Sequence, residues 1–135
     1  MVLSAIVPHV LLADDSPMQQ AAASGVLRKN GFRVTCVNDG HAAVAALQKR
    51  DYDVVLMDVD MPVMDGLAAT VEIRQLETMV YVYTPIVAFT TGTDRDRCFI
   101  AGMDAFAAKP LTAADLEMLV AIVAKVKLRL DTRTA

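Results

Sequence analysis

The sequence predicts an α/β fold, in which five parallel strands form one sheet that helices cover on both faces. Short apolar runs alternate with longer helix-like segments five times in succession. Strands that are apolar throughout are typical of a parallel sheet that is buried on both faces. The chain has 135 residues, of which 55% are hydrophobic, so it is large enough to bury one core without disulfides.

The first strand is predicted over residues 9–13, "HVLLA". Ser16 then begins a helix with Pro17 at its first position, and this helix runs to about Lys29 before an Asn-Gly pair ends it. Gln19 follows Ser16 by three residues, which completes a capping-box pattern at the helix start.

Two strands and two helices are predicted between residues 32 and 77. Alternating β-branched residues predict a strand over residues 32–37, and an Ala-rich helix follows over residues 41–50. Residues 53–57 contain four apolar residues in a row and form the third strand. An Asp-Gly pair then begins a helix that extends from residue 65 to about residue 77.

The fourth strand, "IVAFT", covers residues 86–90, and a brief helix over residues 94–102 precedes a fifth strand over residues 104–108. Thr112 caps the last helix. One side of that helix carries a predicted apolar stripe, made of Leu116, Leu119, Val120, Val123 and Val126.

Polar side chains follow four of the five predicted strands. They are Asp14 and Asp15 after the first strand, Asp58 after the third, Thr90 and Thr91 at the end of the fourth, and Lys109 after the fifth. Because ligands bind outside the carboxyl ends of parallel strands, we expect these groups to converge. Three carboxylates remain ionised together only if a cation compensates them, and oxygen ligands without His or Cys favour Mg²⁺ or Mn²⁺.

This set of groups suits a phosphoryl group. Magnesium bridges readily to phosphate oxygens, Lys109 supplies positive charge, and Thr90 supplies a hydrogen-bond donor. Asp58 is the best candidate for the nucleophile, since a carboxylate can form a covalent aspartyl phosphate.

Four segments, in this order, resemble the receiver domain of two-component response regulators, including those attached to hybrid histidine kinases. They are "LLADDS" with Asp14 and Asp15, "VVLMDVDMPVMDG" with Asp58, Pro62 and Gly66, "IVAFTT" with Thr90, and "GMDAFAAKP" with Phe106, Lys109 and Pro110. The resemblance implies a flavodoxin-like, doubly wound (βα)5 fold with strand order 2-1-3-4-5. It also implies a single receiver domain over residues 1–135, with a core of about residues 9–128.

The resemblance implies a role for each acid. Asp58 would accept a phosphoryl group from a phosphohistidine on a kinase or phosphotransfer protein. Asp15 and Asp58 would bind Mg²⁺ together with the backbone carbonyl of Asp60, and Asp14 would act through water.

The resemblance also implies a switch. Thr90 and Lys109 would hold the phosphoryl oxygens, and Phe106 would change rotamer as Thr90 moves. Output would then emerge on the face made by the fourth helix, fifth strand and fifth helix. Such a domain is not an enzyme in the usual sense, since it catalyses only its own phosphorylation and dephosphorylation.

Three positions depart from the family's pattern. Only 11 residues separate Thr90 from Gly102, which shortens the region of the fourth helix. Thr91 stands where a smaller residue is usual, and Asp60 places an acid at a variable position. We hypothesise that Asp60 alters the lifetime of the phosphoryl group, because its charge lies near the attacking water or the donor.

Two other functions are compatible with the residues. A haloacid dehalogenase-type phosphatase also uses two Asp residues spaced like Asp58 and Asp60, with the second as general acid/base. However, Pro62 stands where that family has Thr or Val, and the paired acids precede the nucleophile. A receiver-like interaction module that is never phosphorylated is the other alternative, although none of the site residues is missing.

Composition narrows the partners. A net charge of −3 provides no basic surface for nucleic acid or an anionic membrane. Two cysteines without metal-site spacing fit a reduced compartment, and the apolar N-terminus has no basic leader, so we expect a cytoplasmic protein. The expected partners are a histidine kinase or histidine phosphotransfer protein and a downstream output protein in trans.

Overall fold

Strands and helices alternate along the chain, as the apolar runs predict. The computed structural model describes residues 7–61, 63–80, 82–92 and 95–134. The strands are β1 (His9–Ala13), β2 (Arg33–Val37), β3 (Val54–Met57), β4 (Ile86–Thr90) and β5 (Ala105–Ala108). The helices are α1 (Pro17–Lys29), α2 (Gly40–Lys49), α3 (Gly66–Val80), α4 (Arg95–Ala101) and α5 (Ala113–Thr134).

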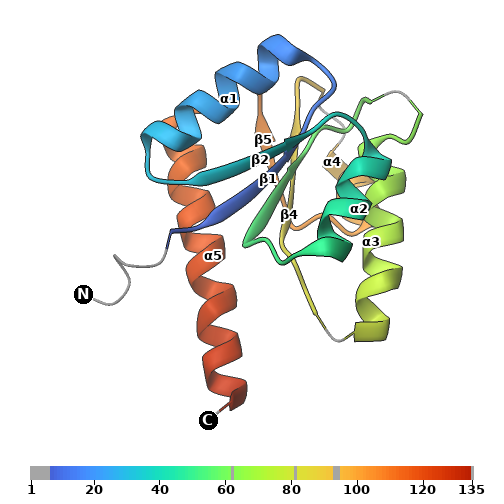
Figure 1. Ribbon diagram of the computed structural model, residues 1–135, viewed down its shortest axis with the longest axis vertical. Coiled ribbons are helices and arrows are strands. Elements are labelled where there is room, and N and C mark those ends of the chain that lie inside the picture. Colours follow the sequence, from blue (N-terminus) through green and yellow to red (C-terminus); the bar gives the residue numbers. More distant parts are fainter. Residues whose placement is uncertain (1–6, 62, 81, 93–94, 135) are drawn as a thin grey trace.

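The five strands form one sheet in the order β2-β1-β3-β4-β5, and every neighbouring pair is parallel (Figure 1). This is the predicted flavodoxin-like order. The chain passes from β1 to β2 on one side and then returns to β3 on the other, so the order reverses between β1 and β3. The carboxyl ends at such a reversal flank the crevice in which ligands of open α/β sheets bind.

Successive residues of each strand point to opposite faces of the sheet and build two separate core layers. Leu11, Val55 and Ile86 belong to the layer under α2, α3 and α4. Leu12 and Leu56 belong to the layer under α1 and α5. Figure 1 shows these two groups of helices on opposite faces of the sheet. Burial on both faces explains why the central strands lack any polar alternation.

Capping residues fix where the helices begin. Ser16 accepts a hydrogen bond from a backbone N–H of α1, and Asp39 accepts one from the first turn of α2. At α5, the Thr112 hydroxyl accepts from the Asp115 backbone N–H, while the Asp115 carboxylate accepts from the Thr112 backbone N–H. This is a reciprocal capping box, and it confirms Thr112 as the cap.

The structure corrects two details of the prediction, and two residues named in the prediction lie outside its described segments. Helix α3 continues to Val80, because nothing after Glu77 breaks it. Val120 is 53% exposed, so the buried stripe of α5 is narrower than predicted. Pro62 of the matching motif and Asp94, the first residue of the predicted brief helix, lie outside the described residues.

Across the described segments, the helices are too short or too polar to cross a membrane.

Candidate functional site

Backbone hydrogen bonds continue the sheet by one residue beyond the ends of the strands. The Asp58 N–H donates to the Ala13 carbonyl at 2.9 Å, and the Lys109 N–H donates to the Thr90 carbonyl at 3.1 Å. The Asp14 N–H likewise donates to a carbonyl at the end of β2. The polar residues after β1, β3 and β5 are therefore held in the register of the sheet itself.

Three carboxylates meet at this edge. One oxygen from each of Asp14, Asp15 and Asp58 lies within 4.8 Å of the others. Asp14 and Asp58 are buried, while Asp15 is exposed to solvent. The structure thus brings together the three acids that the sequence places after the first and third strands.

Lys109 joins the acids from β5. Its Nζ donates to Asp14 Oδ2 at 2.7 Å and to Asp58 Oδ2 at 3.2 Å. The side chain is only 9% exposed, and its Nζ lies 5.3 Å from the centre of the Phe89 ring. The ammonium is therefore nearly enclosed and faces the pair of buried carboxylates.

Burial raises the pKa of the Asp58 carboxyl, and the Lys109 ammonium acts in the opposite direction without offsetting that effect. The Asp14 charge adds to the rise. Lys109 thus does not offset the burial of Asp58, and a further cation beside this carboxylate would favour its charged form.

Asp60 and Thr90 border the cluster in different ways. The Asp60 N–H donates to Asp58 Oδ1 at 3.1 Å, while the Asp60 residue itself is exposed. The Thr90 hydroxyl is buried at the end of β4 and accepts from the Gly92 N–H at 3.1 Å. Thr91, the next residue, is exposed. Thr90 is tied to the site through the backbone bond to Lys109.

Gly66 closes the loop that follows Asp58. Its N–H donates to the Val59 carbonyl at 3.0 Å, and a Cβ at this position would lie 2.1 Å from the Asp58 carbonyl oxygen. Only glycine allows the start of α3 to lie this close to the backbone of Asp58. This explains the glycine that follows Asp65 in the matching motif.

Phe106 lies on β5, half-buried against the core layer under α2, α3 and α4. The Arg95 guanidinium, at the start of α4, lies 4.8 Å from the centre of its ring. The ring is therefore covered from outside by a cation.

Gln19 was not predicted as a site residue. Its Oε1 accepts from Lys109 Nζ at 2.7 Å, whereas the capping-box pattern places it on the Ser16 backbone N–H. That N–H donates instead to Asp14 Oδ1 at 2.9 Å. An acid two residues before the N-cap is the sequence signal that could have shown that Asp14 and Gln19 compete for the Ser16 N–H.

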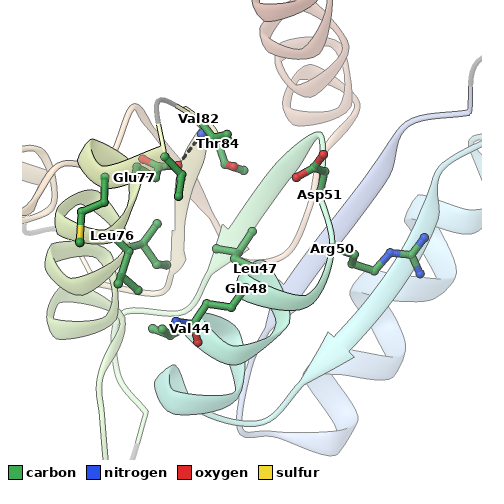
Figure 2. Close-up of a pocket in the computed structure, with 12 residues that line it drawn as sticks. Val44, Leu47, Gln48, Arg50, Asp51, Leu76, Glu77, Val82 and Thr84 are labelled. Carbon is green, nitrogen blue, oxygen red and sulfur yellow. Dashed lines mark hydrogen bonds between the residues drawn. The ribbon is translucent and has the colours of Figure 1, made fainter.

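A pocket lies away from the cluster of acids. It has a volume of about 540 Å³ and lies between α2 and α3. Figure 2 shows Leu47 and Leu76 among its apolar walls. The Glu77 carboxylate in it already accepts from Arg74 and from the Thr84 N–H. Because Asp51 and Thr84 precede β3 and β4, this pocket lies at the amino ends of these strands, remote from the site.

Comparisons with known proteins point to one family. The sequence profile of the response regulator receiver domain matches residues 10–121. The sensor histidine kinase GacS of Pseudomonas protegens is 36% identical over 122 residues, and the transcription factor SKN7 of Saccharomyces cerevisiae is 39% identical over 115 residues. These matches cover 87% and 82% of this chain, but only 13% of GacS and 18% of SKN7.

Solved structures agree. The receiver domain of the sensor histidine kinase PA1611 from Pseudomonas aeruginosa is 39% identical with a TM-score of 0.78, and the match covers 88% of this chain and 99% of that one. That protein was solved with a magnesium ion in its active site cleft. The chemotaxis protein CheY4 of Vibrio cholerae is 30% identical with a TM-score of 0.76, over 87% of this chain and 99% of that one.

Proposed function

The chain belongs to the response regulator receiver family of two-component systems, and we propose on this basis that Asp58 is its phosphoacceptor. The observation that carries the proposal is the cluster of Asp14, Asp15 and Asp58 at the sheet edge, with the Lys109 ammonium on two of them. The family match favours this function over a haloacid dehalogenase-type phosphatase.

In the proposed reaction, an Asp58 carboxylate oxygen attacks the phosphorus of a phosphohistidine. A P–O bond forms as the P–N bond breaks, and the electron pair of the broken bond stays on the imidazole. Lys109 balances charge on the phosphoryl oxygens, and the Thr90 hydroxyl donates to one of them. The burial of Asp58 limits the access of water to the product.

The carboxylates fit a hard divalent cation, because three oxygen donors lie within 4.8 Å and Asp58 is undercompensated by Lys109 alone. Asp15, Asp58 and the Asp60 carbonyl would hold Mg²⁺ or Mn²⁺ directly, and Asp14 through water. The ion would neutralise charge on the phosphoryl group during transfer.

The proposed partners follow from this chemistry. The donor is a histidine kinase or histidine phosphotransfer protein, and a change at Thr90 and Phe106 alters binding of a downstream output protein in trans. Phe106 packs next to α4, whose Arg95 covers its ring, so a rotamer change there would disturb α4. We place the protein in the cytoplasm, with no direct contact to nucleic acid or membrane.

The acceptor is tested by incubation with acetyl phosphate and Mg²⁺, followed by intact mass spectrometry. Wild type gains one phosphoryl group, and chelation of the metal prevents it. Asp58→Asn gains none, while the matched variant Asp60→Asn still gains one. If wild type stays unmodified, the chain is better explained as an interaction module that is never phosphorylated. If it hydrolyses para-nitrophenyl phosphate, the haloacid dehalogenase-type phosphatase becomes the favoured function.

Wild type and Asp60→Asn also test the role of Asp60. The Asp60 N–H donates to Asp58 Oδ1, so the backbone of Asp60 lies directly beside the proposed acceptor, and its side chain is exposed to solvent. We expect phosphorylated Asp60→Asn to lose its phosphoryl group at a rate different from wild type. Equal rates reject the hypothesis.

A further inference from the structure

The Lys109 ammonium has three hydrogens to donate, and three acceptors surround it. Asp14 Oδ2 and Gln19 Oε1 each lie 2.7 Å from Nζ, and Asp58 Oδ2 lies at 3.2 Å. The two short bonds therefore go to groups other than the proposed acceptor. The longest bond is the one to Asp58.

Gln19 is held where it can make this contact. It is the third residue of α1, and its backbone N–H donates to the Ser16 hydroxyl at 3.3 Å. Because Asp14 takes the Ser16 N–H, the Gln19 amide is not used in the cap and reaches across to Lys109.

The neighbouring residue anchors the same turn of α1. The Gln20 side-chain amide donates to the Asp14 carbonyl at 2.8 Å and to the Val37 carbonyl at 3.0 Å. The first turn of the helix is thus hydrogen-bonded to the ends of β1 and β2, which fixes the position of the Gln19 backbone.

We propose that Gln19 is a positioning residue for Lys109, which aims one ammonium hydrogen at the phosphoryl group; this rests on the proposed function. When Asp58 becomes an acyl phosphate, its long bond to Lys109 is exchanged for one to a phosphoryl oxygen. Asp14 and Gln19 keep the other two donors in place. Gln19 does so without adding a fourth negative charge beside the acids.

The first test is made on metal-free protein, by NMR of the Lys109 ammonium with ¹⁵N-labelled lysine. Loss of the signal in Lys109→Arg assigns it. Gln19→Met keeps the length and helix propensity of the side chain but removes the acceptor. We expect its ammonium protons to exchange with water roughly fivefold faster than in wild type, about the effect of one net hydrogen bond.

Two variants control this measurement. Gln19→Glu retains an oxygen at the same reach and restores the slow exchange. Gln75→Met makes the same change at an exposed residue of α3 and leaves exchange unchanged. Equal melting temperatures for the Met variants show that folding is intact.

The second test is the rate of phosphorylation by acetyl phosphate at saturating Mg²⁺. We expect Gln19→Met to react roughly fivefold more slowly than wild type, and Gln75→Met to react at the wild-type rate. Unchanged ammonium exchange in Gln19→Met, or changed exchange with an unchanged rate, overturns the inference. A wild type that is not phosphorylated overturns the proposed function itself, which is a separate result.

Discussion

At Asp58, burial and charge act against each other. Burial raises the pKa of this carboxyl, and Lys109 compensates only in part. An acid whose pKa is higher in the folded than in the unfolded state favours folding only while it is protonated. Its contribution is present below the ordinary pKa of an aspartate and is lost as the pH rises through the folded-state value. At neutral pH, the metal-free protein therefore contains an acid that opposes folding.

Replacing this acid with its neutral isostere gives a pH-dependent prediction. In the presence of a chelator at pH 7, we expect Asp58→Asn to melt a few degrees above wild type. The difference shrinks as the pH falls through the raised folded-state pKa and is gone below about 4, because the carboxyl is then protonated in the folded and the unfolded wild type. Thermal unfolding across this pH range is the measurement. A variant that melts below wild type at pH 7 would show that Lys109 outweighs burial.

Among the helices, α3 shows how an element is joined to the chemistry. Gly66 begins it, directly against the carbonyl of Asp58, which belongs to the loop after β3. A methyl group at this place would overlap the backbone of Asp58 and the Met57 side chain, and backbone cannot turn aside, so either the helix or Asp58 must move. The start of α3 and the position of Asp58 are therefore set together.

Gly66→Ala should lower the free energy of unfolding by about 1–3 kcal/mol, the usual cost of forcing atoms into a packed place. Phosphorylation by acetyl phosphate should fall as well, because the backbone of Asp58 is displaced. Urea denaturation and mass spectrometry measure the two effects.

Gly25→Ala is the matched control within α1, where an added Cβ meets nothing within 4 Å. It should raise stability by about 0.5–1 kcal/mol and leave phosphorylation intact. Equal effects of the two alanines would contradict the close approach at Gly66.

On the scale of the whole molecule, Arg74 connects parts that lie far apart in sequence. From α3, its guanidinium donates to the Gly102 carbonyl at 2.9 Å, the Thr84 carbonyl at 2.9 Å and Asp104 Oδ2 at 2.8 Å. These partners stand at the end of α4, before β4 and before β5. The guanidinium also lies 4.2 Å from the centre of the Tyr83 ring. One side chain thus fastens the amino edge of the sheet to two helices.

Arg74→Met keeps the apolar stem but removes the guanidinium from two carbonyls and from the carboxylates of Glu77 and Asp104. We expect it to lower the free energy of unfolding by about 2–4 kcal/mol, measured by urea denaturation. Arg28→Met serves as the control, because the exposed Arg28 donates to the Val34 carbonyl alone among the described residues. Its loss should cost about 0.5 kcal/mol or less. Similar losses for both variants would refute the special role of Arg74.

The sequence was sufficient for the fold because each strand is a short apolar run and each helix has its own boundary signals. It was also sufficient to predict the meeting of Asp14, Asp58 and Lys109, since parallel strands bring their carboxyl ends to one edge. No local signal marked the end of α3 at Val80. Val120 was misplaced because helical periodicity defines a stripe but not how much of it the sheet covers.

Gln19 shows the kind of contact that local patterns miss. Its capping-box partner was one turn away, whereas its actual partner, Lys109, is 90 positions along the chain. The choice between them depends on Asp14 taking the Ser16 N–H first. Such competition among three groups is decided by tertiary structure.

The backbone bonds that extend the ladder beyond the strands have a consequence for how such domains diversify. Backbone bonds from the sheet hold Asp58 and Lys109, so a substitution on the outward face of a helix leaves the position of these two residues unchanged. Exposed apolar residues such as Ile100 on α4 and Val120 on α5 lie on these outward faces. The surface that a partner can contact and the cluster at the sheet edge thus depend on different residues, and similar segments accordingly occur in a sensor histidine kinase and in a transcription factor.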